Sequence, residues 1–246
     1  MMEPNNAGLP ATTAPATFRQ GIKDSLPIVI GYMPVAFAFG LNAVKLGFTP
    51  LEGLFISCII YAGASQFVIT TLLSAGVSLW IAALTVMTMD VRHLLYGPAL
   101  RQRIPGALSP RKTALWAFGL TDEVFAAAIS RLSRDNRSWS ETWMIGVALC
   151  AWLSWVAGTL TGVCSGNGLL DDWPAVSAAL GFMLPALFLS FLLAAFQRRQ
   201  SLVLAAALVG ALAGLWLVSI PMAILGGIGG GCLAALLSSL KEGRRD

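Results

Sequence analysis

Residues 200–240 read QSLVLAAALVGALAGLWLVSIPMAILGGIGGGCLAALLSSL, a stretch without a single Asp, Glu, Lys, Arg or His. A helix that crosses a membrane needs about 20 consecutive apolar residues. This stretch is therefore long enough for two such helices, and we expect the division between them near residues 218–221, where a proline occurs.

The same pattern continues toward the N-terminus, where residues 54–89, 142–170 and 173–197 also lack all five of these residue types. Over the whole chain 57% of residues are hydrophobic and 11% are charged, whereas a soluble domain carries roughly a quarter charged residues. Helices buried in a large soluble core are the alternative, but such a core needs polar faces elsewhere to form a surface, and this sequence offers none. We therefore expect an integral membrane protein.

The predicted fold is an all-α, polytopic transmembrane helical bundle of about seven to eight membrane segments, some of them broken. Residues 1–20, rich in Ala, Thr, Pro and Asn, are expected to form a disordered tail. Residues 21–240 form the predicted transmembrane domain, and residues 241–246 a charged C-terminal tail. Before residue 200, segments are expected at about 25–44, 51–73, 79–95, 113–132, 143–163 and 175–196.

Proline and small residues indicate where these segments break. Pro34 predicts a kink or break in the first segment, and the small residues of 61–67 (YAGASQF) predict one in the second. Turns that contain Pro50 and Pro174 precede the second and sixth segments. Pro185 lies as far beyond Pro174 as the predicted break in the second segment lies beyond Pro50, and this correspondence indicates a weak internal repeat. The alternative is that apolar helices simply resemble one another.

The distribution of charged residues does not give one consistent orientation of the chain in the membrane. Arg19 and Lys23 favour a cytoplasmic N-terminus, and the acidic turn at residues 171–172 favours the periplasm. A basic loop at residues 101–112 would then lie outside if every segment crossed the membrane. One solution is that segment 113–132, or a broken helix, does not fully cross.

Composition excludes several classes of function. The net charge of +4 arises from short basic clusters between segments, without the basic stripe interleaved with aromatics that nucleic-acid binding requires. The cysteines show no paired spacing, and the chain has one histidine, so we expect no metal site, no disulfide framework and no cofactor. Glycines four residues apart indicate close helix packing at Gly158/Gly162, Gly210/Gly214 and Gly226/Gly230.

Charged residues inside a membrane segment are the first candidates for chemistry, since each costs about 2.5 to 3.5 kcal/mol to insert. Asp122 and Glu123 lie in the middle of segment 113–132, where they can hold an ammonium group or relay a proton. Pairing with an arginine of a neighbouring helix is the structural alternative. Asp90 and His93 share a helix face and can serve a proton relay, although such residues also cap helices at the membrane interface.

Residues 61–67 are the third candidate region, with Ser65 and Gln66 as polar groups at mid-depth. If the helix unwinds here, its exposed amides can bind a carboxylate as helix N-termini do. A packing seam of small residues is the alternative.

Five motifs together resemble the AzlC family: DSLPIVI at 24–30, PVAFAFG at 34–40, YAGASQF at 61–67, MDVRH at 89–93 and AFGLTDEVF at 117–125. The resemblance extends over about residues 18–240. It implies a bacterial inner-membrane exporter of branched-chain amino acids driven by an ion gradient, with L-valine foremost and leucine, isoleucine and methionine as further substrates. It also implies an obligate small membrane partner of the AzlD/YgaH type.

The residues of such a site follow from physical reasoning rather than from the family. We expect Asp122 or Glu123 to face the substrate ammonium, and the break at Gly63, Ser65 and Gln66 to meet its carboxylate. Phe67 and Phe125 would line an apolar pocket. The coupling proton would be accepted by Asp90, His93, Asp122 or Glu123.

Other classes of membrane protein remain as alternatives. A channel or passive pore predicts flux that ignores the proton gradient, and a scaffold subunit of another complex would tolerate loss of every buried charge. An enzyme is not expected, because no nucleophile-and-base constellation occurs.

Overall fold

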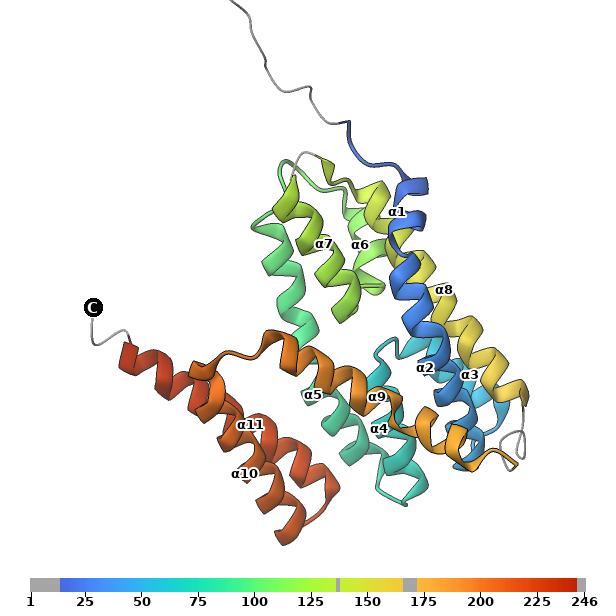
Figure 1. Cartoon of the computed structure of the whole chain (residues 1–246), viewed down its shortest axis with the longest axis vertical. Helices are drawn as coiled ribbons and strands as arrows, with labels where there is room; N and C mark the ends of the chain where they lie inside the picture. The colour runs from blue at the N-terminus through green and yellow to red at the C-terminus, as the bar shows by residue number, and fades with distance from the viewer. Residues whose placement is uncertain (1–13, 136–137, 166–171, 243–246) are drawn as a thin grey trace, which may run out of the picture. The chain divides into compact units, whose positions relative to one another are not determined.

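The computed structural model describes residues 14–135, 138–165 and 172–242, and this part of the chain is helical without strands (Figure 1). The prediction of an all-α fold is therefore confirmed. The α-helices are α1 (Phe18–Asp24), α2 (Leu26–Lys45), α3 (Pro50–Ile59), α4 (Gly63–Ser74), α5 (Leu79–Arg101), α6 (Pro110–Phe118), α7 (Asp122–Arg134), α8 (Glu141–Ser165), α9 (Pro174–Ala195), α10 (Ser201–Leu217) and α11 (Ile220–Glu242), with a short 3-10 helix, η2, at Arg198–Gln200.

Three described helices are long and apolar enough to cross a membrane, namely α2, α8 and the Ile220–Leu240 part of α11. Shorter apolar helices are α3, α10 and the Pro174–Met183 part of α9. Large apolar side chains such as Trp80 and Trp216 are 85% and 93% exposed. Such exposure is what lipid-facing helices require, since lipid rather than water surrounds them.

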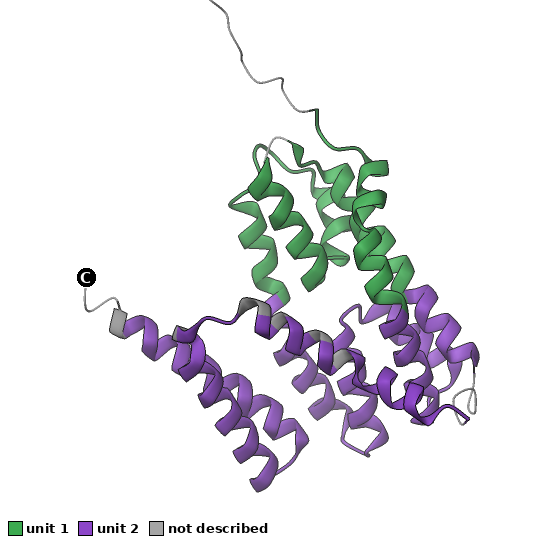
Figure 2. Cartoon of the chain, in the orientation of Figure 1, with its two compact units in different colours: residues 1–33, 93–155 green, residues 34–92, 156–246 purple. Residues whose placement is uncertain are grey.

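The chain divides into two compact units (Figure 2). Unit 1 comprises residues 1–33 and 93–155, and unit 2 comprises residues 34–92 and 156–246. The divisions fall inside three continuous helices, α2, α5 and α8.

In unit 1, helix α6 begins beside the start of α8. The Glu141 carboxylate of α8 accepts hydrogen bonds from the Ser109 amide (3.0 Å) and the Thr113 hydroxyl (3.1 Å). At the other end of α6, a Cβ on Gly119 would lie 2.7 Å from the Cβ of Ala148, so the chain packs tightly there against α8. Helix α6 therefore runs alongside the first turns of α8, in the same direction.

Helix α7 runs back the way α6 came. Its cap, Thr121, contacts the Tyr32 hydroxyl of α2, whereas Arg131, near its other end, bonds to Asp24, which precedes α2. The α6–α7 pair is therefore a re-entrant hairpin that enters and leaves unit 1 on the side where α2 and α8 begin.

The prediction of one helical segment at 113–132 was wrong, because the chain breaks between α6 and α7. Gly119 follows α6 as its C-cap, a position where glycine is common because it ends helices readily. Thr121 then accepts a hydrogen bond from the Val124 amide as N-cap of α7. Asp122 and Glu123 consequently lie in the first turn of a helix rather than in the middle of one.

Unit 2 contains a second hairpin, made of α3 and α4. Early in α3, the Cβ position of Gly53 lies 3.1 Å from Val163, near the end of α8. One turn later Ser57 bonds to Thr159 at 2.7 Å, so α3 runs antiparallel to α8. Phe67 of α4 packs edge-on against Phe39 of α2 (5.3 Å between ring centroids), and α4 then ends in a turn into α5.

The contacts of α4 show that this helix runs back toward the side where α3 begins. Thr71 lines a common cavity with Asn42 and Lys45, at the end of α2. Ile69 and Leu72 form a buried apolar cluster with Ala82 and Val86 of α5. The α3–α4 hairpin thus enters and leaves unit 2 on the side where α2 and α8 end.

Two expectations about proline are corrected. The predicted break at Pro34 is absent, because helix α2 continues through it; the alternative prediction of a kink there stays a prediction. The buried residues Val35 and Ala36 follow Pro34, and packing in a helical membrane protein can compensate for one lost backbone hydrogen bond. Pro50 and Pro174 do not open equivalent elements either. Helix α3 ends after 10 residues, whereas α9 continues for 22 residues through Pro185.

The two hairpins correspond instead. Pro50 and Pro110 each follow a hydroxyl-bearing residue, Thr49 or Ser109, at the start of a helix. The first hairpin has arms of 10 and 12 residues, and the second has arms of 9 and 13 residues. Proline is favoured at this first helical position because its missing N–H has no intrahelical partner there.

Close packing at glycines is confirmed for α10 and α11, where Cβ atoms on Gly210 and Gly226 would lie 2.2 and 2.4 Å from each other's carbonyl oxygens. Gly214 and Gly230 approach the opposite helix as closely. Gly162 of α8 likewise meets Gly40 of α2, with its Cβ position 3.0 Å from the Gly40 Cα. Small residues thus allow backbone-to-backbone contact, the usual way that membrane helices associate.

Ordered structure begins before the predicted boundary at residue 21. Helix α1 starts at Phe18, and its cap Thr17 forms a capping box with Gln20. The Ala16 amide donates to the Ser138 carbonyl at 3.0 Å. Residues 1–13 of the predicted tail and residues 243–246 of the charged tail lie outside the described residues.

Candidate functional site

The tip of the α6–α7 hairpin carries a half-buried carboxylate, Glu123, in unit 1. The Tyr32 hydroxyl of α2 donates a hydrogen bond to Glu123 Oε2 and lies 2.6 Å from Thr121 Oγ1. Tyr32 is 5% exposed, and Trp155 of α8 packs edge-on against its ring (5.1 Å between centroids). Glu123 is therefore held by neutral hydroxyl-bearing side chains that are themselves fixed by packing.

The neighbouring carboxylate has a partner of the same kind. The Tyr96 hydroxyl of α5 donates to Asp122 Oδ1. The Tyr96 ring stacks on Phe125 (4.4 Å between centroids, planes 16° apart), and His93 packs edge-on against it at 5.2 Å. His93, Tyr96, Asp122 and Phe125 thus form one contact chain in unit 1.

The helix itself also favours these two carboxylates. Both lie in the first turn of α7, where unpaired backbone amides and the helix dipole stabilise negative charge. The alternative considered from sequence, an arginine partner, is not what holds Glu123, because within the described residues its side-chain partner is Tyr32. Within the described residues, a neutral hydroxyl therefore holds the half-buried Glu123 carboxylate.

Sequence reasoning missed Tyr32, Tyr96 and Thr121. A signal was available for the tyrosines, since the chain has three of them, two within predicted apolar segments and Tyr96 directly after the segment at 79–95. A buried tyrosine hydroxyl usually has a hydrogen-bond partner, so a tyrosine in a membrane segment indicates a polar group nearby. The role of Thr121 had no such signal, because it depends on where α7 begins.

In unit 2, the helix break predicted from residues 61–67 lies between α3 and α4. Gln66, which is 0% exposed, donates a hydrogen bond from Nε2 to the Ile60 carbonyl. Ser57 donates to Gln66 Oε1 at 3.2 Å and lies 2.7 Å from Thr159 Oγ1. This buried network joins the two arms of the hairpin to α8. It gives the Ile60 carbonyl a second donor, beside the Ala62 amide at 2.9 Å.

The other polar residue of the break holds an acidic side chain. Ser65, also 0% exposed, donates a hydrogen bond to Asp90 Oδ1 of α5 at 2.7 Å. Ser65 and Gln66 were expected to offer their side chains to a substrate, but both are engaged within the protein. What the break does present is the start of α4 at Gly63, where no side chain caps the helix.

Phe67 lies between two cavities of unit 2. The first, about 280 Å³, is apolar and is lined by Ala64, Phe67, Val68, Thr71, Leu72, Pro185, Phe188, Ile220 and Ile224. The second, also about 280 Å³, includes the polar residues Asn42, Lys45, Thr71 and Ser177. Phe67 and Thr71 line both cavities.

The expected site residues divide between the two units. His93, Asp122, Glu123 and Phe125 belong to unit 1, and Gly63, Ser65, Gln66, Phe67 and Asp90 belong to unit 2. Contacts within unit 1 join its four residues to Tyr32 and Tyr96. Contacts within unit 2 join Ser65 to Asp90, and place Gln66 at the break. Among the described residues no three His, Cys, Asp or Glu side chains lie close enough to hold a metal ion.

Apolar helices, two re-entrant hairpins and half-buried carboxylates at a helix start together define a multi-pass helical membrane protein. The chain belongs to the AzlC family, whose model, described as AzlC protein, matches residues 27–169. It is 70% identical over 231 residues to the inner membrane protein YgaZ of Escherichia coli (strain K12), covering 94% of each chain. It is accordingly an inner-membrane protein of this family.

More distant relatives extend the comparison. The branched-chain amino acid transport protein AzlC of Bacillus subtilis (strain 168) is 27% identical over 175 residues, which cover 71% of this chain and 66% of the relative. An uncharacterized membrane protein of Archaeoglobus fulgidus is 41% identical over 178 residues, covering 72% and 75%. No solved structure matches the chain.

Proposed function

We propose that this protein is the large subunit of a two-component secondary exporter of branched-chain amino acids, L-valine foremost, with leucine, isoleucine and methionine as further substrates. A small AzlD/YgaH-type membrane protein is the proposed second subunit. The observation that carries the proposal is the half-buried Glu123 carboxylate at the hairpin tip, held by Tyr32. The name of the Bacillus subtilis relative supports the substrate class.

Glu123 is the proposed proton-coupling group. Within the described residues its side chain is bound by a neutral hydroxyl, so taking up a proton leaves no buried cation without its counter-ion. An intramembrane carboxylate that can change its charge in this way is the usual element of a proton relay. Asp122, bound by Tyr96 in the same manner, is the second candidate, and Asp90 and His93 remain proposed contributors.

Substrate recognition is proposed for unit 2. The uncapped first turn of α4 at Gly63 offers backbone amides to the substrate carboxylate, as broken helices of transporters do. The apolar cavity beside Phe67 offers space of about 280 Å³ to a branched aliphatic side chain. Ser65 and Gln66 act as positioning residues, since they fix the start of α4 through Asp90 and the Ile60 carbonyl.

The test is counterflow and net export of labelled L-valine in proteoliposomes, with and without the small subunit, at two proton gradients. We expect export that depends on the gradient and requires the partner. Flux that ignores the gradient would instead indicate a channel. Absence of flux for all four amino acids under every condition would contradict the substrate assignment.

One variant distinguishes a role in proton coupling from a role in substrate binding. Glu123→Gln is expected to retain valine exchange at equal concentrations and to lose export driven by the gradient. If Glu123 and Asp122 serve the substrate ammonium instead, exchange itself will fail. Full export by the Glu123→Gln/Asp122→Asn double variant would refute both roles and favour a scaffold.

A further inference from the structure

A basic cavity lies in unit 1, away from the hairpin tip. It has a volume of about 630 Å³ and is lined by residues of α1, α7 and the start of α8. Its charged residues are Lys23, Asp24, Arg131 and Arg134, and its largest aromatic residue is Trp143. Neither the proposed coupling group nor the proposed substrate cavity includes any of these side chains.

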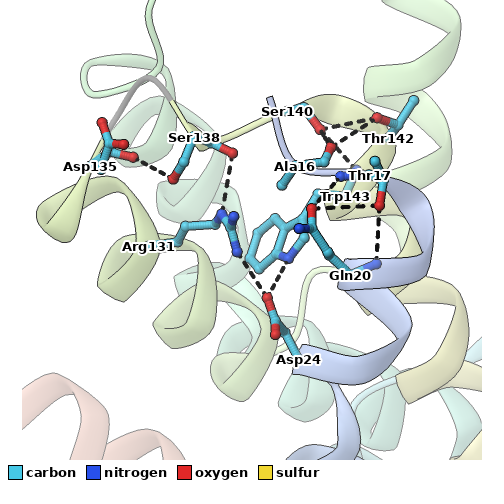
Figure 3. Close-up of polar contacts among 10 residues, drawn as sticks. All are labelled: Ala16, Thr17, Gln20, Asp24, Arg131, Asp135, Ser138, Ser140, Thr142 and Trp143. Carbon is cyan, nitrogen blue, oxygen red and sulfur yellow. Dashed lines mark hydrogen bonds and ion pairs between the residues drawn. The ribbon is translucent and has the colours of Figure 1, made fainter. Parts of the chain in front are cut away.

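Arg131 is held firmly in one wall of this cavity (Figure 3). Its Nη1 donates to Asp24 Oδ2 at 2.8 Å, and its Nε donates to the Ser138 carbonyl at 3.3 Å. The guanidinium also lies 4.8 Å from the centroid of the Trp143 ring, whose Nε1 donates to the same Asp24 oxygen at 2.8 Å. The Arg131 side chain is only 22% exposed, so its guanidinium is held in one orientation before any ligand binds.

The charges of the cavity do not balance. Asp24 neutralises Arg131, but the cavity holds two more cations, Lys23 and Arg134. Within the described part of the chain, neither forms a side-chain hydrogen bond or ion pair. Three cations and one carboxylate therefore surround a common space, which favours an anion with several acceptor oxygens.

The cavity also lies at the membrane boundary. Lys23 and Asp24 immediately precede α2, and Trp143 stands in the first turn of α8, and both helices are candidate membrane spans. Trp143 itself is only 2% exposed, so its ring forms the inner wall of the cavity rather than a contact with lipid. Phe18 and Ile22 of α1 are 38% and 41% exposed, one turn apart, as in a helix that contacts the membrane surface.

We propose that this cavity binds the phosphate group of an anionic phospholipid. Lys23 and Arg134 supply the neutralising charge, and Arg131, fixed by Asp24 and Trp143, supplies oriented N–H donors. Basic pockets between membrane helices on the cytoplasmic side bind such headgroups. Inorganic phosphate presents the same chemistry and is the one other source of this ligand to be distinguished.

The experiment compares three forms of the full-length protein: wild type, Lys23→Gln/Arg134→Gln, and the matched control Arg111→Gln/Lys112→Gln. The control removes two exposed cations of the same unit that do not line the cavity. Each is placed in nanodiscs of neutral phosphatidylcholine, with or without phosphatidylglycerol, and with or without inorganic phosphate. Bound lipid is counted by native mass spectrometry, and thermal unfolding is recorded in parallel.

We expect phosphatidylglycerol to raise the melting temperature of wild type and control. The cavity variant should bind it about 30-fold more weakly, because each basic side chain near the surface contributes roughly 1 kcal/mol toward anionic lipid. Equal melting temperatures in neutral lipid confirm that the variant folds.

If inorganic phosphate raises the melting temperature of wild type and control but not of the cavity variant, the cavity binds an anion, and its ligand is a free phosphate ion rather than a lipid. Equal lipid binding by all three forms, with no phosphate response, overturns the proposal.

Discussion

The hydroxyl of Tyr32 donates a hydrogen bond to Glu123, a residue 91 positions further along the chain. The same hydroxyl contacts Thr121, the cap of α7. One side chain of α2 therefore fixes both the start of α7 and the carboxylate in its first turn. The coupling proposal rests on this relationship, and it can be tested by removing the hydroxyl.

Tyr32→Phe removes the donor to Glu123 and keeps the ring that packs against Trp155. We expect export driven by the gradient to fall about tenfold or more, with the KM for valine exchange unchanged, because the variant disturbs the coupling carboxylate and not the substrate cavity. Transport kinetics in proteoliposomes at several pH values provide the measurement. An unchanged pH profile would count against a positioning role for Tyr32.

Gln66→Leu removes the amide that joins Ser57 to the Ile60 carbonyl. The Ser57 hydroxyl keeps Thr159 as a partner and the Ile60 carbonyl keeps the Ala62 amide, so the variant loses two hydrogen bonds but leaves neither group unpaired. One such bond contributes about 0.5–1.5 kcal/mol net, so we expect the free energy of unfolding to fall by about 1–3 kcal/mol. Denaturant titration in detergent provides the measurement. Gln102→Leu, at an exposed position after α5, is the control and should change stability little; equal losses in both variants would contradict the role of the break.

Phe67→Trp places a larger ring between the two cavities of unit 2. If the apolar cavity holds the substrate side chain, the variant should lower valine export about tenfold, because one methylene in an apolar pocket is worth about 1–3 kcal/mol. It should lower leucine export further. Phe182→Trp, at a site 62% exposed on α9, is the control; equal loss for all substrates and for both variants would argue against recognition at Phe67.

The re-entrant hairpins predict a labelling pattern. In a variant without its natural cysteines, Gln102→Cys and Ser133→Cys flank α6–α7 and should react with an impermeant thiol reagent from the same membrane face. Leu51→Cys and Ala75→Cys flank α3–α4 and should likewise react from one common face. Sealed vesicles of known orientation provide the measurement, and opposite labelling within either pair would show that the hairpin crosses the membrane.

This pattern also resolves the inconsistency in the distribution of basic residues. The loop before α6 and the end of α7 lie on the side of unit 1 where α2 begins. Arg101, Arg103, Arg111 and Lys112 then share a side with Lys23, as the positive-inside rule expects of a cytoplasmic face. From the sequence, this arrangement was one of the solutions left open, namely that segment 113–132 does not fully cross.

In the candidate site, the sequence predicted the acidic residues but not the side chains that bind them. Asp122 and Glu123 were predicted as buried polar residues because charge is rare in apolar segments. Their partners Tyr96 and Tyr32 were missed, and so was the engagement of Ser65 by Asp90. Each of these contacts joins residues of different helices.

The sequence by itself determined that this chain is a helical membrane protein, where most of its segments lie, and that glycines mediate packing of α10 on α11. These properties follow from the composition of each segment, because the transfer of a residue from water to lipid depends chiefly on that residue and its own helix.

Only the tertiary structure decided that α3–α4 and α6–α7 turn back, and that tyrosines hold the two carboxylates at the start of α7. The direction of a chain after a helix break depends on contacts such as that of Ser109 with Glu141, 32 residues away, and no local pattern of residues encodes those.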